Sequence, residues 1–348
     1  MSAPEDRPQR RSVESKGRET TLADIARHAG VSAMTVSRAL NRPESLKPKT
    51  LAQVMKAVEA LGYVPNTLAR SLATQRTHAV AVIIPVLNQV FAPTIEGMTR
   101  VLAGEGFDLI LGISNYCAAT EEGLVAAFLA RRVDGVVLVG ASHTPRTRTL
   151  LTQTGAPVVQ MWTVPEAPLE SYVGVSHEKG ARAMTRYLCQ TGRRRIGYIG
   201  GITRENDRTS ARLEGFLAQM REFGTEVPEA HVEEAPHFLI EEGARAFERL
   251  WARAPDLEAV FAASDVLAAG AVFAAQRMGL RIPEDLAIAG FDDAEIARSM
   301  IPSLTTIRID ADTIGARAAS AILERLATPD LSPLALELPA ELIVREST

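Results

Sequence analysis

Residues 21–41 read TLADIARHAGVSAMTVSRALN, and this run predicts two short helices joined by a tight turn. Thr21 and Asp24 match the Ser/Thr-x-x-Asp/Glu spacing of a capping box, which begins a helix. Gly30 predicts a left-handed stop after that helix. Ser32 can cap a second helix over 33–40, which ends near Asn41. The apolar residues of the first helix recur on one face: Leu22, Ile25, Ala26 and Ala29.

A third helix follows. Pro48 stands near its start and Gly62 closes it. Leu51, Val54, Val58 and Leu61 lie on its expected buried face. Between the first two helices, Val31 and Val36 occupy the two positions of a hydrophobic staple. The whole segment predicts a helix-turn-helix, a motif whose second helix enters the major groove of DNA.

The second helix presents small and apolar side chains, with one cation, to a groove. Ala33 and Met34 can contact a thymine methyl group. Arg38 can form a bidentate contact to guanine or hold a phosphate, and Ser37 lies beside it. Short donors suited to phosphate oxygens are Thr21, Ser32, Thr35, Asn41 and Thr50. The alternative is a small three-helix cap that binds nothing.

Charge is distributed unevenly along the 348 residues. Residues 1–80 hold 13 Lys/Arg and 7 Asp/Glu, a net charge of +6, whereas the remainder holds 25 and 35, a net charge of −10. A basic head on an acidic body is expected where only the head meets a polyanion. The first 18 residues are polar and charged, which predicts an unfolded tail.

From residue 79 onward, short apolar runs alternate with helical stretches. Predicted strands cover 79–84, 107–113, 135–139, 157–161, 196–199, 259–263 and 286–289. Predicted helices lie near 92–105, 119–131, 178–191, 209–222, 240–252, 266–278 and 312–326. This alternation predicts parallel sheets covered by helices, arranged as two α/β subdomains facing a cleft with a ligand at the strands' carboxyl ends.

Several classes of protein lack their sequence signals here. No apolar run reaches the ~20 residues that cross a bilayer, and the N-terminus has no apolar secretory segment. Cys117 and Cys189 form no metal-binding spacing, and the six histidines form none either. We find no dinucleotide, phosphate-loop or nucleophile-elbow motif. We therefore expect a cytoplasmic binding protein with no cofactor, no metal and no enzymatic activity.

Residues 21–41, followed by LGYVPN at 61–66, resemble the N-terminus of LacI/GalR-family repressors. The resemblance continues through 133–138, 195–201, 262–265, 282–293 and 302–307. It implies a periplasmic-binding-protein-like effector domain of two parallel-sheet subdomains behind the head. Within the family, residues 87–92, 142–147 and 207–209 are similar to the gluconate-operon repressor branch.

The family resemblance also implies a domain plan. The expected parts are a tail at 1–18, a helix-turn-helix domain at 19–65, a hinge at 66–77, and an effector-binding and dimerisation domain at 78–348. In the hinge helix, Leu72 matches a leucine that wedges into the minor groove of operator DNA, with Ala69 one turn earlier. Tyr63 and Asn66 are further DNA contacts that the resemblance implies. A homodimer on a pseudo-palindromic operator is expected.

The family's effector contacts map onto six positions of this chain: Val90, Phe91, Trp162, Arg212, Ser264 and Asp292. Val90 and Phe91 would form an apolar wall. Trp162 would either stack on a sugar or pack in the core. Ser264 stands where many relatives have asparagine, so its contact is in doubt.

Arg212 and Asp292 suggest the kind of ligand. An arginine on one side for a carboxylate, and an aspartate on the other for hydroxyls, suits gluconate or a related sugar acid. Another sugar is the alternative ligand. The rival functions are a sugar-binding protein that does not bind DNA and an enzyme acting on sugar acids.

Overall fold

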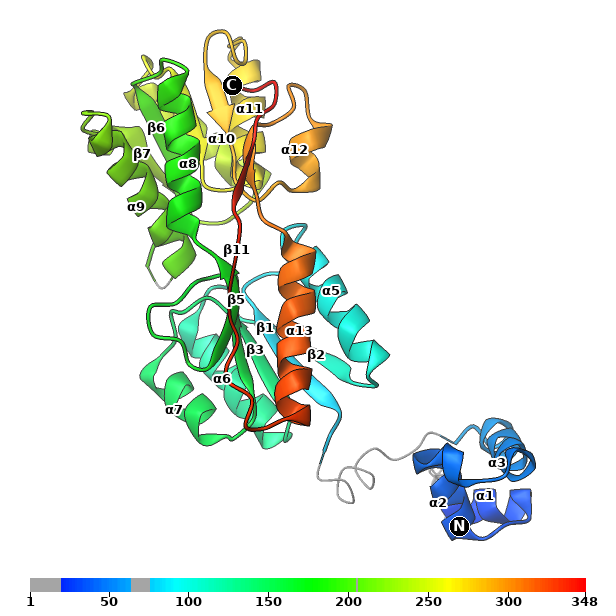
Figure 1. Cartoon of the computed structure of the whole chain (residues 1–348). Helices are drawn as coiled ribbons and strands as arrows, with labels where there is room; N and C mark the ends of the chain where they lie inside the picture. Colours follow the sequence, from blue (N-terminus) through cyan, green and yellow to red (C-terminus); the bar gives the residue numbers. More distant parts are fainter. Residues whose placement is uncertain (1–19, 64–75, 205) are drawn as a thin grey trace, which may run out of the picture. The chain divides into compact units, whose positions relative to one another are not determined.

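The computed structural model describes residues 20–63, 76–204 and 206–348. The chain forms two compact units, divided between Thr74 and Gln75. Figure 1 traces the first unit as helices and the second as two lobes of strands and helices. The predicted hinge helix lies outside the described residues, and the predicted domain boundaries remain predictions.

The first unit is the predicted helix-turn-helix. It contains α1 (Leu22–Ala29), α2 (Ala33–Asn41), a short 3-10 helix, η1 (Pro43–Ser45), and α3 (Pro48–Ala60). The capping box at Thr21 is confirmed, because the Thr21 backbone N–H donates to Asp24 Oδ2 at 3.0 Å and Asp24 N–H donates to Thr21 Oγ1 at 3.4 Å. Gly30 has φ +64°, the left-handed stop that the sequence predicted.

Three buried side chains from three helices form the core of this unit. Ile25, Val36 and Val54 are fully buried against one another, with Leu51, Val58 and Leu61 packed at the edge. Gln53 of α3 donates its side-chain amide to the carbonyl of Ala29 at 2.7 Å. This bond ties α3 to the end of α1, so the turn before α2 is held from two directions.

The N-terminal lobe of the second unit is a six-stranded parallel sheet. Its strand order is β11-β5-β4-β3-β1-β2. The strands are β1 (Ala79–Ile84), β2 (Asp108–Ile113), β3 (Gly135–Val139), β4 (Val158–Met161), β5 (Ser171–Val175) and β11 (Ala335–Leu338). Helices α5 (Ala92–Gly104) and α13 (Ala311–Ala327) pack together on it, and so do α6 (Ala118–Ala130) and α7 (Pro145–Gln153).

The C-terminal lobe repeats this plan with a four-stranded parallel sheet, ordered β7-β6-β8-β9. Its strands are β6 (Ile196–Gly201), β7 (Val232–Ala235), β8 (Ala259–Ala262) and β9 (Ala287–Ala289). Helices α8 (His177–Gln190) and α9 (Asp207–Glu222) pack as one pair, and α10 (Ile240–Arg253) and α11 (Asp265–Arg277) as another. A 3-10 helix, η2 (Glu229–His231), and a short helix, α12 (Glu295–Ser299), complete the lobe.

The chain crosses between the lobes after β5, after β10 (Thr306–Arg308) and after β11. Strand β11 joins the N-terminal sheet, whereas the next strand, β12 (Glu341–Ile343), pairs antiparallel with β10. Figure 1 shows this last segment, in red, running from one lobe into the other. Crossings of this kind link the pose of one lobe to that of the other.

The predicted strands and long helices are confirmed to within a few residues. The sequence reading missed β5, β7, β10, β11, β12, α7 and α12. β11 alternates between exposed and half-buried positions, β12 has no buried residue, and β5 reads SYVGV, in which Ser and Gly interrupt the apolar residues. None of these strands forms an uninterrupted apolar run. Helix α7 reads PRTRTLLTQ, which is too polar to predict burial.

Within the described residues, no helix is long and apolar enough to cross a membrane. Across the same ranges, no group of three or more His, Cys, Asp or Glu could hold a metal ion.

Candidate functional site

A cavity lies between the two lobes of the second unit. Residues of the N-terminal lobe line one side: Asn88, Val90, Phe91, Tyr116 and Trp162. Residues of the C-terminal lobe line the other: Asn206, Arg208, Thr209, Arg212, Phe238, Ser264, Val266 and Asp292. The cavity thus includes all six positions expected to contact an effector, although the contact itself remains a prediction.

Arg212 lies in the second turn of α9 and is held by three acceptors. Its Nη2 donates to Asp292 Oδ1 at 3.1 Å, its Nε donates to His177 Nδ1 at 3.1 Å, and its Nη1 donates to the carbonyl of Ala263. The guanidinium also stacks on Phe291, 4.0 Å from the ring centroid. The Arg212 side chain is 8% exposed, so the ion pair with Asp292 is a buried one.

The sequence reading placed Arg212 and Asp292 on opposite sides of a ligand, and that arrangement is wrong. The two residues follow strands β6 and β9 of one sheet, so both emerge at the same edge. A buried charge requires a partner, and each of these two residues is the partner of the other. Together they form a nearly neutral pair that faces the cavity.

His177 connects this pair to the N-terminal lobe. It is the first residue of α8, directly after the crossing from β5, and its Nε2 lies 2.6 Å from the carbonyl of Trp162. Burial and the neighbouring Arg212 lower the pKa of His177 well below its usual value. The imidazole is therefore neutral, with the proton on Nε2 donated to Trp162 and Nδ1 accepting from Arg212. Sequence reasoning did not identify this residue.

Asp292 occupies a strained backbone position with φ +110°. Such a conformation costs on the order of 1–3 kcal/mol and persists only where its surroundings enforce it. Burial raises the pKa of Asp292 to about 6, although Arg212 opposes the rise. The carboxylate is consequently close to its titration point and is sensitive to any change in its partner.

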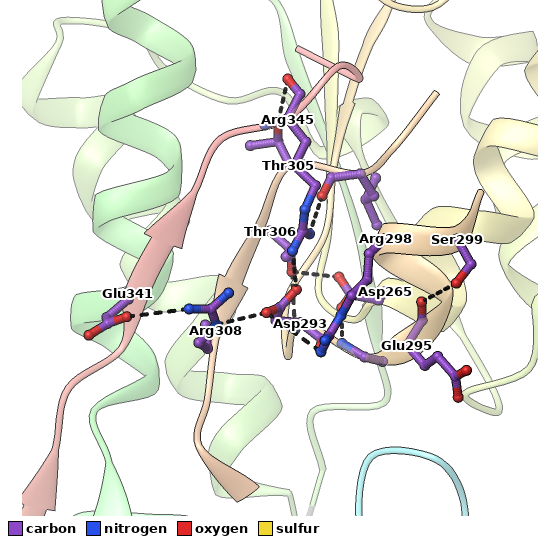
Figure 2. A network of polar contacts seen from close by, with 12 residues as sticks. Asp265, Asp293, Glu295, Arg298, Ser299, Thr305, Thr306, Arg308, Glu341 and Arg345 are labelled. Carbon is purple, nitrogen blue, oxygen red and sulfur yellow. Dashed lines mark hydrogen bonds and ion pairs between the residues drawn. The ribbon is translucent and has the colours of Figure 1, made fainter. Parts of the chain in front are cut away.

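Figure 2 shows a polar network that includes Asp265 and Asp293, the residue that follows Asp292 in the chain. Asp293 accepts from Arg308 Nε at 2.8 Å and from Arg345 Nη2 at 2.5 Å. Asp265 accepts from Thr306 Oγ1 at 2.6 Å and from the N–H of Ala294 at 2.7 Å. The network holds Asp293 and Ala294, the two residues that follow Asp292. The Asp292 and Asp293 side chains have different partners, since Asp292 accepts from Arg212 and Asp293 from Arg308 and Arg345.

The apolar wall comes from the N-terminal lobe. Phe91 and Trp162 pack with ring centroids 4.9 Å apart, and the Trp162 indole N–H donates to Thr94 Oγ1 at 3.1 Å. Trp162 is only 2% exposed, so it serves as a packed wall of the cavity. Ser264 is 2% exposed, and its hydroxyl caps α11 by accepting from the N–H of Leu267 at 3.3 Å.

Sequence reasoning missed seven of the lining residues: Asn88, Tyr116, Asn206, Arg208, Thr209, Phe238 and Val266. Tyr116 and Phe238 come from different lobes and pack at 5.7 Å. No local sequence pattern indicates that Tyr116 and Phe238 line the cavity. Arg208 did carry a signal, because it lies four residues before Arg212 and therefore on the same helical face.

On the first unit, the exposed side of α2 carries the predicted base-reading residues. Met34 is 66% exposed, Ala33 and Arg38 are exposed, and Arg38 Nη2 lies 3.7 Å from Met34 Sδ. Ser37 is half-buried beside them.

Four of the five predicted phosphate donors lie at or within three residues of a helix N-cap. Thr21 and Ser32 cap α1 and α2, and the hydroxyls of Ser32 and Thr35 are 2.9 Å apart, so one donates to the other and a single proton remains for a phosphate. Thr50 is half-buried in α3, and Tyr63 packs on the core of the unit. Asn41 is the last residue of α2. Asn66, Ala69 and Leu72 lie outside the described residues.

Comparisons with known proteins agree with both units. The family "Bacterial regulatory proteins, lacI family" matches residues 21–66, and a periplasmic binding protein-like domain matches residues 185–348. The HTH-type transcriptional regulator GntR of Pseudomonas aeruginosa is 35% identical over 329 residues, covering 94% of this chain and 95% of that protein. The regulator CelR of Thermobifida fusca is 33% identical over 342 residues, covering 95% and 98% of the two chains.

A solved structure extends this similarity to the fold. A LacI-family transcriptional regulator from Silicibacter pomeroyi superposes with a TM-score of 0.87 at 31% identity, covering 94% of this chain and 99% of that one. A CelR–cellobiose complex superposes with a TM-score of 0.70 at 31% identity, covering 95% and 100%. The similarity thus spans the helical unit and both lobes.

Proposed function

The chain belongs to the lacI family of bacterial regulatory proteins and is a DNA-binding transcriptional regulator, and from this premise we propose that it is a repressor controlled by a sugar acid, gluconate or a close relative. The observation that carries the proposal is the pairing of a capped helix-turn-helix with an interlobe cavity that combines an aromatic wall with arginines and an aspartate. The relatives named above are regulators, and we infer that this chain is likewise no enzyme and acts in the cytoplasm, where the chromosome lies.

On DNA, we propose a homodimer that places two helix-turn-helix heads on the half-sites of a pseudo-palindromic operator. Residues 19–65 would form the head, 66–77 the hinge, and 78–348 the effector-binding and dimerisation domain, after a tail at 1–18. In the hinge, Leu72 and Ala69 would contact the minor groove, with Tyr63 and Asn66 supporting the approach. The exposed face of α2, with Met34 and Arg38, would read the major groove.

In the cavity, we propose that Val90, Phe91 and Trp162 cover the carbon skeleton of the effector. Arg212, Asp292 and Ser264 supply polar groups on the facing lobe. The resemblance to gluconate-operon repressors favours an acid. Another sugar is the alternative, and cellobiose in the CelR complex is a ligand of that protein.

Effector binding would act through the relative pose of the lobes. Asp207 of the C-terminal lobe accepts the N–H of Ala141, in the N-terminal lobe, at 3.1 Å. A ligand that fills the cavity shifts such interlobe contacts only by as much as its affinity differs between the two poses. We propose that gluconate favours the pose that releases the operator.

The test is capture of fragmented genomic DNA by the purified protein, with and without gluconate, followed by sequencing. Enrichment of a few palindromic sites, lost when gluconate is added, is the expected result. Enrichment that is unchanged by gluconate would support the assignment as a repressor but contradict gluconate as its effector. An absence of specific enrichment at moderate salt, where phosphate contacts weaken, would favour a binding protein without DNA.

The hinge makes a separate prediction. Substituting Leu72 by Ala should weaken operator binding about tenfold or more, because an inserted apolar side chain offsets the cost of unstacking a base step. Effector affinity should remain nearly unchanged. Operator binding can be measured by fluorescence anisotropy and effector affinity by calorimetry. Unchanged operator affinity in this variant would contradict the proposal that Leu72 inserts into the minor groove.

Effector affinity should also depend on pH through Asp292. Because its pKa is raised to about 6, the carboxylate becomes protonated between pH 7 and pH 5 and loses acceptor capacity. His177 stays neutral across this range, since its pKa is lowered well below the usual value.

We expect gluconate to bind several-fold more weakly at pH 5 than at pH 7, as measured by calorimetry. In the Asp292→Asn variant the affinity should be low at both values. A wild-type profile that is flat between them would refute this role.

The same shift affects folding. The pKa of Asp292 is higher in the folded protein than in the unfolded chain, so its contribution to stability is fully present below pH 4 and is lost as the pH rises through about 6. Asp292→Asn should therefore flatten the stability profile in that window. Urea unfolding of both proteins at several pH values measures the difference.

A further inference from the structure

We propose that Arg208, and not Arg212, binds the carboxylate of the effector and so selects an acid over a neutral sugar. The inference rests on the proposed function, because it concerns the same cavity. It names a residue that the sequence reading had not placed among the effector contacts, and it moves the anionic end of the ligand to a different part of the cavity.

Arg212 has little capacity left for an anion. Three of its five N–H groups are donated to His177, Ala263 and Asp292. Its charge is matched by the Asp292 carboxylate at 3.1 Å. A second carboxylate at Arg212 would lie beside that first one in a poorly hydrated site, where repulsion between like charges is strong. Arg212 and Asp292 are therefore better suited to hydroxyl groups, one donating and the other accepting.

Arg208 is placed differently. It is the second residue of α9, its side chain is only 9% exposed, and it lines the cavity one helical turn before Arg212. Its one partner among the residues that the structure describes is Asp207, which accepts from Nη1 at 3.0 Å. Within the described part of the chain, the opposite edge of the guanidinium, formed by Nε and Nη2, has no partner for its N–H groups. That edge presents the paired N–H geometry that fits a carboxylate.

Asp207, the partner of Arg208, also accepts a second hydrogen bond, so it neutralises the charge of Arg208 only in part. Asp207 Oδ2 accepts the N–H of Ala141 at 3.1 Å, so the Asp207 carboxylate is divided between a backbone donor and Arg208. Asp207 is also 22% exposed, and solvent screens its charge. Arg208 is the more buried member of this pair, at 9% exposure, so solvent screens its charge less than it screens the charge of Asp207.

Gly140 fixes where the guanidinium lies. Gly140 directly follows β3 with φ +88°, and a Cβ atom built on it would clash with Arg208 Nη1 and lie 2.7 Å from Asp207 Oδ1. Only glycine permits both the backbone angle and this close approach. The backbone of the N-terminal lobe therefore lies directly against the Arg208–Asp207 pair of the C-terminal lobe, on the Nη1 side of the guanidinium.

Arg208 also lines a second, smaller pocket beside the main cavity. This pocket shares Arg208 and Tyr116 with the main cavity and carries the hydroxyl-bearing residues Ser114 and Ser142. Its two carboxylates already have partners, because Glu121 pairs with His143 and Asp207 pairs with Arg208. A carboxylate at Arg208 would sit where the two spaces meet. The polyol chain would then run into the main cavity, toward Arg212 and Asp292.

Calorimetry on the purified full chain, with gluconate and with glucitol as probes, tests the proposal. Glucitol is the neutral polyol in which a hydroxymethyl group replaces the carboxylate. The wild type should prefer gluconate by about tenfold to a hundredfold, as expected for charge-assisted bonds in a buried site. Arg208→Gln should reduce that preference to about threefold or less while glucitol affinity stays nearly constant. Arg208→Lys, which keeps the charge but not the paired donors, should retain part of it.

Arg245→Gln is the matched control, because Arg245 is an exposed arginine of α10 that pairs with Glu241 at 2.6 Å. It should leave both affinities unchanged. Operator binding without ligand, measured on the same preparations, reports correct folding and tests the regulator function separately. If the wild type prefers gluconate and Arg208→Gln preserves that preference, Arg208 does not bind the carboxylate, although the proposal of an acidic effector is retained. If the wild type shows no preference for gluconate, both are overturned.

Discussion

Replacing Arg212 by glutamine should abolish the response of the operator complex to effector and lower the stability of the second unit. The substitution removes a hydroxyl-binding donor from the cavity and leaves Asp292 buried without its cation. Removing one member of a buried ion pair costs about 3–5 kcal/mol, which corresponds to a fall in Tm of about 10 °C. The variant should bind operator normally at 25 °C and stay bound at gluconate concentrations that release the wild type.

The double variant Arg212→Gln/Asp292→Asn separates the two effects. It replaces the ion pair by two amides of similar shape, so no unpaired buried charge remains. We expect most of the lost Tm to return, while release by gluconate does not. Thermal unfolding and anisotropy on labelled operator provide the two readouts. A single Arg212→Gln variant that is released at the wild-type gluconate concentration would exclude Arg212 from the effector site.

Replacing Arg38 by methionine should weaken specific operator binding about fivefold to 150-fold, the equivalent of 1–3 kcal/mol. Arg38 is exposed on α2, beside Met34, on the face expected to enter the major groove. A bidentate contact to guanine predicts a loss confined to the specific site, with non-specific binding little changed. It also predicts relaxed discrimination at one base pair.

Salt dependence distinguishes this contact from a phosphate contact. If Arg38 held a phosphate, the slope of log affinity against log salt would fall by about one and binding to all sequences would weaken together. Arg27→Met is the matched control, because it removes the same charge from α1, where Arg27 pairs with Asp24 at 3.1 Å. Equal losses in the two variants would show that charge alone matters.

The helical head could be read from the sequence because its signals act over four residues or fewer. The capping box at Thr21, the left-handed stop at Gly30 and the cap at Ser32 each depend on neighbours in the same turn. The buried strands were found for a similar reason, since β1 and β3 are uninterrupted apolar runs whatever they pair with. Edge strands such as β11 and β12 have no such run, and their identity depends on partners far along the chain.

The sequence alone therefore determined the helix-turn-helix, the two parallel-sheet lobes and the family to which the chain is related. Only the tertiary structure decided which residues contact one another around the cavity. Arg212 and Asp292 are 80 residues apart, and Tyr116 and Phe238 come from different lobes, yet each pair is in contact. Sheet order and lobe crossings bring such residues together, and no local periodicity encodes that placement. The physical reason is that a buried charge needs a partner, and the fold decides which group lies close enough to be that partner. Here the fold pairs Arg212 with Asp292, which the sequence analysis had placed on opposite sides of a ligand.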